Sequence, residues 1–319
     1  MGTLLFASER ASRPIETCAL KPFLAGAART GHHIVLITSD IISARRHLCQ
    51  VPATLALAPG VVDSTGTASA KDRWHLLYEE FRPDAVIALD SPEALAASAS
   101  LECPKVAVNF DPHFAPASTA DVTAIASLPE LCDAEDANIL FLGARLDSEG
   151  AAPRWPALQA PKLFAHLEVH PRVPMVLDML RRLGQSALAA VLDCPIQWLR
   201  FNAQPLRIEP HPVDFELAAE HCDIAILHGD PAEVSFFLQH GVPSLLLPIT
   251  QRQAATARKA GQTGAAVVAD INSPTSMVKA WLALQGSSNF RGAAMQLAEK
   301  HGRLCSADPF ATLSAKAGL

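Results

Sequence analysis

The sequence has few of the features that tie a chain to nucleic acid, to a membrane or to an oxidising compartment. Its net charge is −6, so it carries no basic excess for binding nucleic acid or an anionic membrane. Its longest apolar stretches, such as residues 242–249, contain proline and fall far short of the roughly 20 residues of a membrane helix. The seven cysteines never form a C-x-x-C pair, and no basic region followed by an apolar segment opens the chain. We therefore expect a cytoplasmic protein with buried free thiols, no integral membrane segment and no nucleic-acid partner.

The motifs of several enzyme classes are also absent. There is no G-x-S-x-G elbow, Walker loop or G-x-G-x-x-G fingerprint, so serine hydrolase, P-loop and dinucleotide-binding interpretations lack their main support. The histidines show no H-E-x-x-H or comparable ligand spacing. We therefore predict no bound metal.

The chain does contain the pattern of a large α/β protein. Its 319 residues, half of them hydrophobic, are enough for two cores of roughly 150 residues each. Apolar runs alternate with helical patterns in both halves, which predicts parallel sheets covered by helices. The expected strands are 3–7, 34–38, 54–58, 85–89, 105–109 and 138–142, then 162–167, 187–192, 206–208, 224–227, 244–247 and 266–268. The expected helices include 17–29, 71–81, 92–101, 173–183 and 254–260.

A segment rich in proline, glycine and alanine separates the two halves and has no strand or helix period. It is the best candidate for a linker between two domains. We predict a first domain at 1–148, a linker at 149–160, a second domain at 161–305 and a C-terminal tail at 306–319.

The most informative segment is residues 224–269. A buried strand ends at His228, and Pro231 opens a helix that stops near Gly241. A helix N-terminus offers free backbone N–H groups and a partial positive charge, which can hold a diphosphate without a basic patch. A second strand ends before Gln253, which opens the next helix at the same edge. Since parallel sheets bind ligands beyond the carboxyl ends of their strands, we expect a ligand site here.

This segment resembles the nucleotide-sugar-dependent glycosyltransferases of the UDP-glycosyltransferase type (family 1). Members carry H-G-G-x-G-T, a short helix, G-V-P, an apolar strand, proline, an acid followed by Q, and a helix ending near G-A-G. The matching residues here are His228-Gly229, Gly241-Val242-Pro243, Pro248, Gln253 and Gly264-Ala265. Weaker matches lie at Thr30-Gly31-His32 and at 82–90. The resemblance implies the GT-B architecture, with two Rossmann-like doubly wound parallel-sheet domains facing a central cleft.

The resemblance also implies where a nucleotide sugar would bind. His228, Gly229 and the amides around Ala232 and Glu233 would face the diphosphate, and Gln253 would face the sugar hydroxyls. The loop containing Pro212 and Val213 would lie behind the nucleotide base. Four residues of this segment depart from the family pattern. Asp230 replaces the second glycine, Glu233 replaces Thr or Ser, and Arg252 replaces the acid before glutamine. Phe236 stands where many relatives carry a ribose-binding Glu.

Two carboxylates are the candidates for catalysis. By resemblance, Glu16 stands where relatives carry the catalytic histidine, and Asp90 ends a strand whose terminal acid can lie near the base. A carboxylate can remove the acceptor proton if burial or a second carboxylate raises its pKa. The alternative interpretations remain that Glu16 is only a helix-terminus carboxylate and Asp90 only an N-cap. Glu9, after the first strand, is a further candidate.

Three functional hypotheses follow. The first is an inverting glycosyltransferase that moves a sugar from a nucleotide diphosphate to a small or lipid-like acceptor, with the nucleotide sugar as co-substrate and no cofactor. The second is a catalytically degenerate relative that acts as a binding subunit or activator of another enzyme, which Asp230, Glu233, Phe236 and Glu16 favour. The third is a nucleotide-sugar hydrolase or epimerase. A homodimer is left open.

Overall fold

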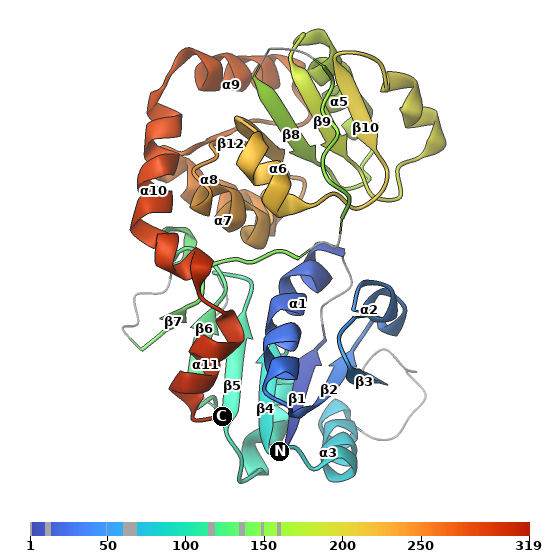
Figure 1. The fold of residues 1–319 in the computed structure, drawn as a ribbon, viewed down its shortest axis with the longest axis vertical. Coiled ribbons are helices and arrows are strands. Elements are labelled where there is room, and N and C mark those ends of the chain that lie inside the picture. The colour runs from blue at the N-terminus through green and yellow to red at the C-terminus, as the bar shows by residue number, and fades with distance from the viewer. Residues whose placement is uncertain are drawn as a thin grey trace. The chain divides into compact units, whose positions relative to one another are not determined.

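The computed structural model describes residues 2–9, 14–48, 50–59, 69–113, 119–133, 138–147, 150–157 and 161–319, without the side chains of 14–16, 47, 305 and 306. The chain forms two compact units. The first contains Met1–Ser127, Asp133–Arg145 and Leu304–Leu319, and the second contains Leu128–Cys132 and Leu146–Arg303. Figure 1 shows a sheet with flanking helices in each unit.

The sheet of the first unit has seven strands among the described residues, in the order β3-β2-β1-β4-β5-β6-β7, and every pairing is parallel. Strands β1, β2 and β4 are almost completely buried, as in a parallel sheet covered on both faces. The strands are β1 (Thr3–Ser8), β2 (His33–Thr38), β3 (Ala53–Leu57), β4 (Ala85–Leu89), β5 (Lys105–Asn109), β6 (Val122–Ile125) and β7 (Leu140–Phe141).

Local signals position the helices of this unit. Helix α3 begins with a capping box in which Ser69 and Asp72 each bond the other's backbone N–H, and it buries Trp74 and Tyr78. The Asp40 side chain caps α2 by accepting from the Ser43 N–H. The helices are α1 (Pro14–Arg29), α2 (Ile41–His47), α3 (Ala70–Phe81), α4 (Pro92–Ala97) and α11 (Pro309–Ala317), with a 3₁₀ helix η1 (Ser98–Ser100).

The sheet of the second unit has six described strands in the order β10-β9-β8-β11-β12-β13, and every pairing is again parallel. This is the strand order of a Rossmann domain, and the central part of the first sheet repeats it. The predicted fold class of two Rossmann-like parallel-sheet domains is therefore confirmed. The strands are β8 (Lys162–His166), β9 (Ser186–Ala190), β10 (Leu206–Glu209), β11 (Ile224–Leu227), β12 (Ser244–Leu246) and β13 (Ala266–Val268).

Helix α7 is the most deeply buried helix of the second unit, since every one of its residues is buried. Its Phe236 and Phe237 rings pack against Phe164 of β8 and Phe215 of α6, with ring centroids 5.5–6.3 Å apart. These contacts hold α7 against β8 and α6. The helices are α5 (Val173–Arg182), α6 (Phe215–His221), α7 (Pro231–Gln239), α8 (Gln251–Gln262), α9 (Pro274–Gly286) and α10 (Asn289–Ser306), with 3₁₀ helices η2 (Pro129–Leu131) and η3 (Ile196–Phe201).

Two short segments lie in a different unit from the residues that flank them in sequence. One comes from the first half of the chain and lies in the second unit, and the other is the C-terminal end, which lies in the first unit. Segment Leu128–Cys132 lies in the second unit, where the Leu128 N–H donates to Ser235 Oγ of α7 at 3.2 Å. The predicted first domain, 1–148, includes this segment. The predicted tail, 306–319, contains α11, which packs on α1 of the first unit and places Asp308 in an ion pair with Arg29. Leu128 and Phe310 of these segments are buried, and local sequence patterns do not reveal which distant part of the chain covers such side chains.

The predicted linker, 149–160, is described only in part. Residues 150–157 belong to the second unit, and residues 149 and 158–160 lie outside the described residues. Ala151 forms an isolated parallel bridge with Val213, and its N–H donates to the Pro212 carbonyl at 3.0 Å. This segment is therefore bonded to the loop that follows β10.

Candidate functional site

Each sheet has one point at which the strand order reverses. In doubly wound sheets, ligands bind beyond the carboxyl ends of the strands at this point, because the loops there diverge. In the first unit the reversal lies between β1 and β4, which are followed by Glu9 and Asp90. In the second unit it lies between β8 and β11, which are followed by Glu168 and His228. The structure thus brings predicted site residues to both of these edges.

His228 is a deeply buried histidine with one unsatisfied nitrogen. Its side chain lies at the end of β11 and is 1% exposed. Nδ1 is 2.8 Å from the Leu247 carbonyl oxygen, whereas Nε2 is buried without a hydrogen-bond partner in the described structure. Burial lowers the pKa of His228, and the Leu247 carbonyl opposes that change. Leaving such a nitrogen unsatisfied costs about 1–3 kcal/mol, which points to a ligand or water as its partner.

Gly229 allows the chain to turn away from β11 against α8. Its φ is +99°, a value that side chains rarely adopt, and an added Cβ would lie 2.9 Å from the Gln253 carbonyl oxygen. Both the backbone conformation and the close approach therefore require glycine here. This explains in physical terms why the predicted His228-Gly229 pair ends in glycine.

The N-terminus of α7 carries carboxylates of its own. Asp230 is 4% exposed, caps the helix and accepts from the Ala232 N–H at 3.1 Å. Glu233, which is 3% exposed, pairs with Nδ1 of His166 at the end of β8. The Ala232 amide that the resemblance assigned to the diphosphate thus has a partner within the chain. Phe236 is buried in the aromatic cluster described above.

The His166–Glu233 pair holds a proton. Burial opposes the charged form of His166, but the adjacent Glu233 carboxylate raises the pKa of this histidine. Burial likewise raises the pKa of Glu233. The pair therefore keeps one proton between two groups and is neutral as a unit. The sequence prediction included Glu233 but missed His166, which carries no motif of its own.

The side-chain amide of Gln253 makes three hydrogen bonds within the protein. It is 1% exposed, and its Oε1 accepts from the N–H groups of Ile249 and Thr250 at 3.0 and 3.2 Å. Its Nε2 donates to Oε1 of Glu168 at 2.9 Å. The amide predicted to contact sugar hydroxyls therefore holds the half-buried Glu168 carboxylate beside His228. The sequence prediction missed Glu168; its place directly after the strand of 162–167 was the available signal.

The remaining donor-side predictions lie on the same sheet edge. Arg252 is in the first turn of α8, where its carbonyl accepts from the Thr256 hydroxyl at 3.4 Å. Val213 is buried and, with Pro212, precedes α6 in the loop after β10. No ligand contact of these residues is tested by the structure, so their roles remain predictions.

The carboxylates of the first unit have backbone partners. Oδ1 of Asp90 accepts from the Phe110 N–H at 3.0 Å, and Asp90 has a φ of +46°. Oε1 of Glu9 accepts from the Ala94 N–H of α4 at 2.9 Å, and burial raises the pKa of Glu9. Glu16 lies in the first turn of α1, and its side chain is outside the described residues. Ser91, not Asp90, is the N-cap residue of α4.

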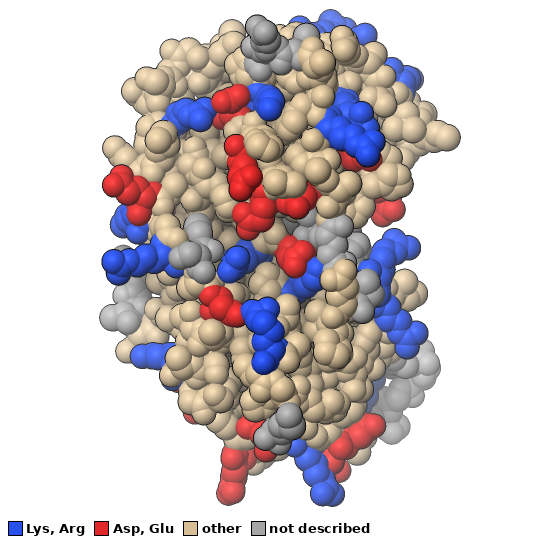
Figure 2. Space-filling model, viewed as in Figure 1, with Lys and Arg blue, Asp and Glu red and all other residues tan. Residues whose placement is uncertain are grey.

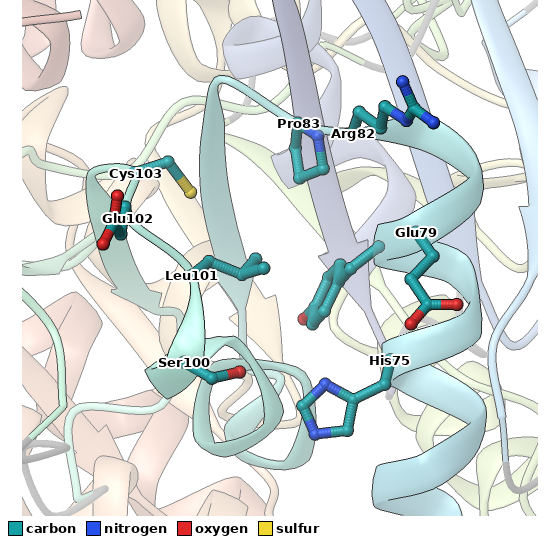
Figure 3. A pocket seen from close by; sticks show the side chains of 9 residues that line it. His75, Glu79, Arg82, Pro83, Ser100, Leu101, Glu102 and Cys103 are labelled. Atoms are coloured by element: carbon teal, nitrogen blue, oxygen red, sulfur yellow. The ribbon is translucent and has the colours of Figure 1, made fainter.

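A cavity of about 680 Å³ lies at the opposite edge of the first sheet. Figure 3 shows His75 and Glu79 of α3 with its C-cap residue Arg82 on one side and the Ser100–Cys103 segment on the other. These residues precede the amino ends of β4 and β5, whereas Glu9 and Asp90 follow the carboxyl ends of their strands. The cavity is therefore separate from the predicted site residues, none of which lines it.

On the face shown in Figure 2, Lys and Arg side chains are interspersed with Asp and Glu side chains. Within the described ranges, no group of three or more His, Cys, Asp or Glu side chains is arranged to hold a metal ion. No helix in the described part of the chain is both long and apolar enough to cross a membrane.

Comparison with known proteins identifies the fold. No protein-family model matches the chain, and no curated protein matches it in sequence. The spinosyn rhamnosyltransferase SpnG matches with a TM-score of 0.75 and 15% identity over 100% of both chains. The calicheamicin glycosyltransferase CalG4 matches with a TM-score of 0.74 and 15% identity, over 100% of this chain and 98% of that chain. SnogD from Streptomyces nogalater gives 0.70 and 15% over 99% of both chains. The chain thus has the GT-B fold of these glycosyltransferases.

Proposed function

We propose that this chain is a glycosyltransferase that binds a nucleoside diphosphate sugar at the β8/β11 edge of its second unit. The observation that carries the proposal is the unpartnered Nε2 of His228 beside the N-terminus of α7, at the reversal point of a Rossmann sheet. A buried nitrogen of this kind is suited to a polar ligand. SpnG, which has the same fold, has been solved with thymidine diphosphate and with spinosyn aglycone, which supports the same two ligand classes here.

On the donor side, His228 and Gly229 contact the diphosphate, with Asp230, Ala232 and Glu233 forming the adjoining helix terminus. Glu168, held by Gln253, faces the same edge and can accept from sugar hydroxyls. Pro212, Val213 and Arg252 border the nucleotide. The nucleotide sugar acts as co-substrate, and the site is proposed to work without a metal.

On the acceptor side, a carboxylate of the first unit removes the proton of a hydroxyl on a small or lipid-like acceptor. The oxygen then attacks the anomeric carbon as the diphosphate leaves, which inverts the configuration at that carbon. Glu16 with Asp90 is the proposed pair. Glu9 is the alternative base, since burial already raises its pKa.

A second function deserves a test because of one specific observation. Two buried carboxylates, Asp230 and Glu233, lie where the resemblance placed glycine and a hydroxyl, and the negative charge of Asp230 repels a diphosphate. This arrangement favours a catalytically degenerate binding subunit or activator of another enzyme. Such a protein would bind a nucleotide sugar weakly and transfer no sugar.

Calorimetry with UDP, dTDP, GDP and their sugars tests donor binding, and mass spectrometry of reactions with a broad acceptor panel tests transfer. A glycosylated acceptor together with released nucleoside diphosphate supports the transferase. Free sugar without a glycosylated acceptor would instead support a hydrolase. Binding without either product favours the binding subunit, and absence of all binding removes the donor-site assignment.

A further inference from the structure

The protonation of His228 at rest follows from geometry. Nδ1 lies 2.8 Å from the carbonyl oxygen of Leu247, and a carbonyl oxygen can only accept, so Nδ1 carries a hydrogen. In the neutral ring Nε2 then has a lone pair and can only accept. A phosphate oxygen also only accepts. The resting histidine is therefore mismatched to the diphosphate that the proposed function brings to it.

We infer that binding of a nucleoside diphosphate sugar at this edge is coupled to uptake of one proton from solvent by Nε2 of His228. The inference rests on the proposed function, because it takes the diphosphate as the ligand. The proton converts the imidazole into an imidazolium with two N–H donors. One donor remains on the Leu247 carbonyl, and the other binds a phosphate oxygen in a charge-assisted hydrogen bond.

The groups around His228 set its balance between neutral and charged forms. Burial disfavours the imidazolium, and so do the nearby His166 and His170. The Leu247 carbonyl and the Glu168 carboxylate favour it. Burial is the largest of these effects, so the unliganded ring is neutral. A diphosphate adds two negative charges beside it and shifts the balance toward the imidazolium.

Two neighbouring side chains, His166 and Gln253, are not equivalent proton acceptors. His166 has Nδ1 committed to Glu233, and that pair already holds a proton. Gln253 does not titrate, and the Ala232 amide donates to Asp230. Asp230 and Glu168 add negative charge, which makes a compensating positive charge on His228 more valuable to an anionic ligand.

Calorimetric titration of UDP-glucose and dTDP-glucose in buffers of different ionisation enthalpy measures the proton uptake. Each phosphate of a nucleotide sugar carries one ester bond and one anhydride bond, so the probes lack the terminal phosphate that titrates near a pKa of about 6. At about pH 7.5 we expect about one proton bound per site, and affinity rising up to about tenfold for each unit by which the pH falls. Binding with no proton uptake would overturn the inference but leave the proposed function intact. No binding of either probe at any pH would overturn both.

Variants identify the group that takes the proton. Asn at position 228 keeps an N–H donor for the Leu247 carbonyl but cannot titrate, so His228→Asn should abolish proton uptake. The matched control, His170→Gln, should retain it. Uptake that persists in His228→Asn but disappears in His166→Gln would place the proton on the buried pair and overturn the assignment.

If His228→Asn does not fold, a measurement on the unaltered protein shows whether Nε2 of His228 takes up the proton. The nitrogen-15 resonance of His228 Nε2 distinguishes an unprotonated from a protonated ring nitrogen. We expect it to change from the first to the second when UDP-glucose or dTDP-glucose saturates the protein. A resonance that stays unprotonated in the bound state would refute the inference.

Discussion

The two sheets have the same central strand order, but their reversal points carry different chemistry. In the first unit, Glu9 and Asp90 accept from backbone N–H groups of Ala94 and Phe110. In the second unit, Glu233 and Glu168 bind side chains. Asp230 caps α7, and His228 keeps one nitrogen unpartnered in the described structure. The shared topology therefore provides two equivalent sheet edges. The residues that follow the strands make the edge of the first unit acidic, whereas the edge of the second unit combines carboxylates with the imidazole of His228. We assign proton removal to the first edge and donor binding to the second.

The largest expected effect is the loss of activity when the proposed base of the first unit, Glu16, is replaced. Glu16→Gln keeps nearly the same volume but removes the proton acceptor, so kcat should fall by about two to four orders of magnitude while donor affinity barely changes. Steady-state kinetics and calorimetry measure the two quantities. Full activity in Glu16→Gln would assign the role of the base to Asp90 or Glu9.

If Glu9 is the base, activity should decline as the pH falls through its raised pKa, because only the ionised carboxylate accepts a proton.

The second edge depends on a glycine. Gly229→Ala forces a side chain onto a φ of +99° and within 2.9 Å of a carbonyl oxygen, so it should destabilise the protein by about 1–3 kcal/mol or more and weaken donor binding. Gly184→Ala is the matched control, since its φ is +70° but nothing lies within 4 Å of the added Cβ. Urea unfolding should show a larger loss for Gly229→Ala. Equal losses would mean that the close contact with α8 has no effect.

The buried His166–Glu233 pair should make the stability of the second unit depend on pH. The unfolded pair loses its last proton above the ordinary histidine pKa of 6.5, whereas the native pair retains one because the pKa of His166 is raised. Stability should therefore fall as the pH rises above 6.5, by up to about 1.4 kcal/mol per pH unit, until the native pair also deprotonates.

Urea unfolding followed by tryptophan fluorescence measures this slope, since Trp155, Trp198 and Trp281 all lie in the second unit. His166→Gln should flatten it. The first unit has no matching pair between Glu9 and Asp90, so Asp90→Asn should leave the slope unchanged. A slope that persists in His166→Gln would assign it to another group.

The smallest expected effect concerns the charge at the N-terminus of α7. Asp230→Gly removes a carboxylate that repels a diphosphate and frees the Ala232 N–H, so donor binding should tighten by a factor of several. Asp230→Asn, which keeps a capping side chain without the charge, separates the two effects in calorimetry. Weaker binding in both variants would make Asp230 a direct ligand contact.

Local patterns predicted most of the fold. Strands β4, β5, β11 and β13 have the predicted bounds, because buried apolar runs between turn residues are a local signal. Proline at the first turn correctly marked the start of α7. The sequence interpretation missed β6, whose four residues lie in a region without clear alternation, and α2, a seven-residue helix that depends on its Asp40 cap. Short elements carry too few residues for a period to be recognised.

The sequence by itself determined the fold class and the positions of His228 and Gly229 at the end of a buried strand. Only the tertiary structure decided which side chains meet there. Glu168 lies 85 residues from Gln253, and His166 lies 67 residues from Glu233. Sequence periodicity reports which face of one element is buried, whereas the strand order of the sheet decides which loops become neighbours at its edge. For this reason the turn from strand to helix at 228–231 could be predicted from the sequence, but the hydrogen-bonded Ala232 amide and the unpartnered nitrogen of His228 in the described structure could not.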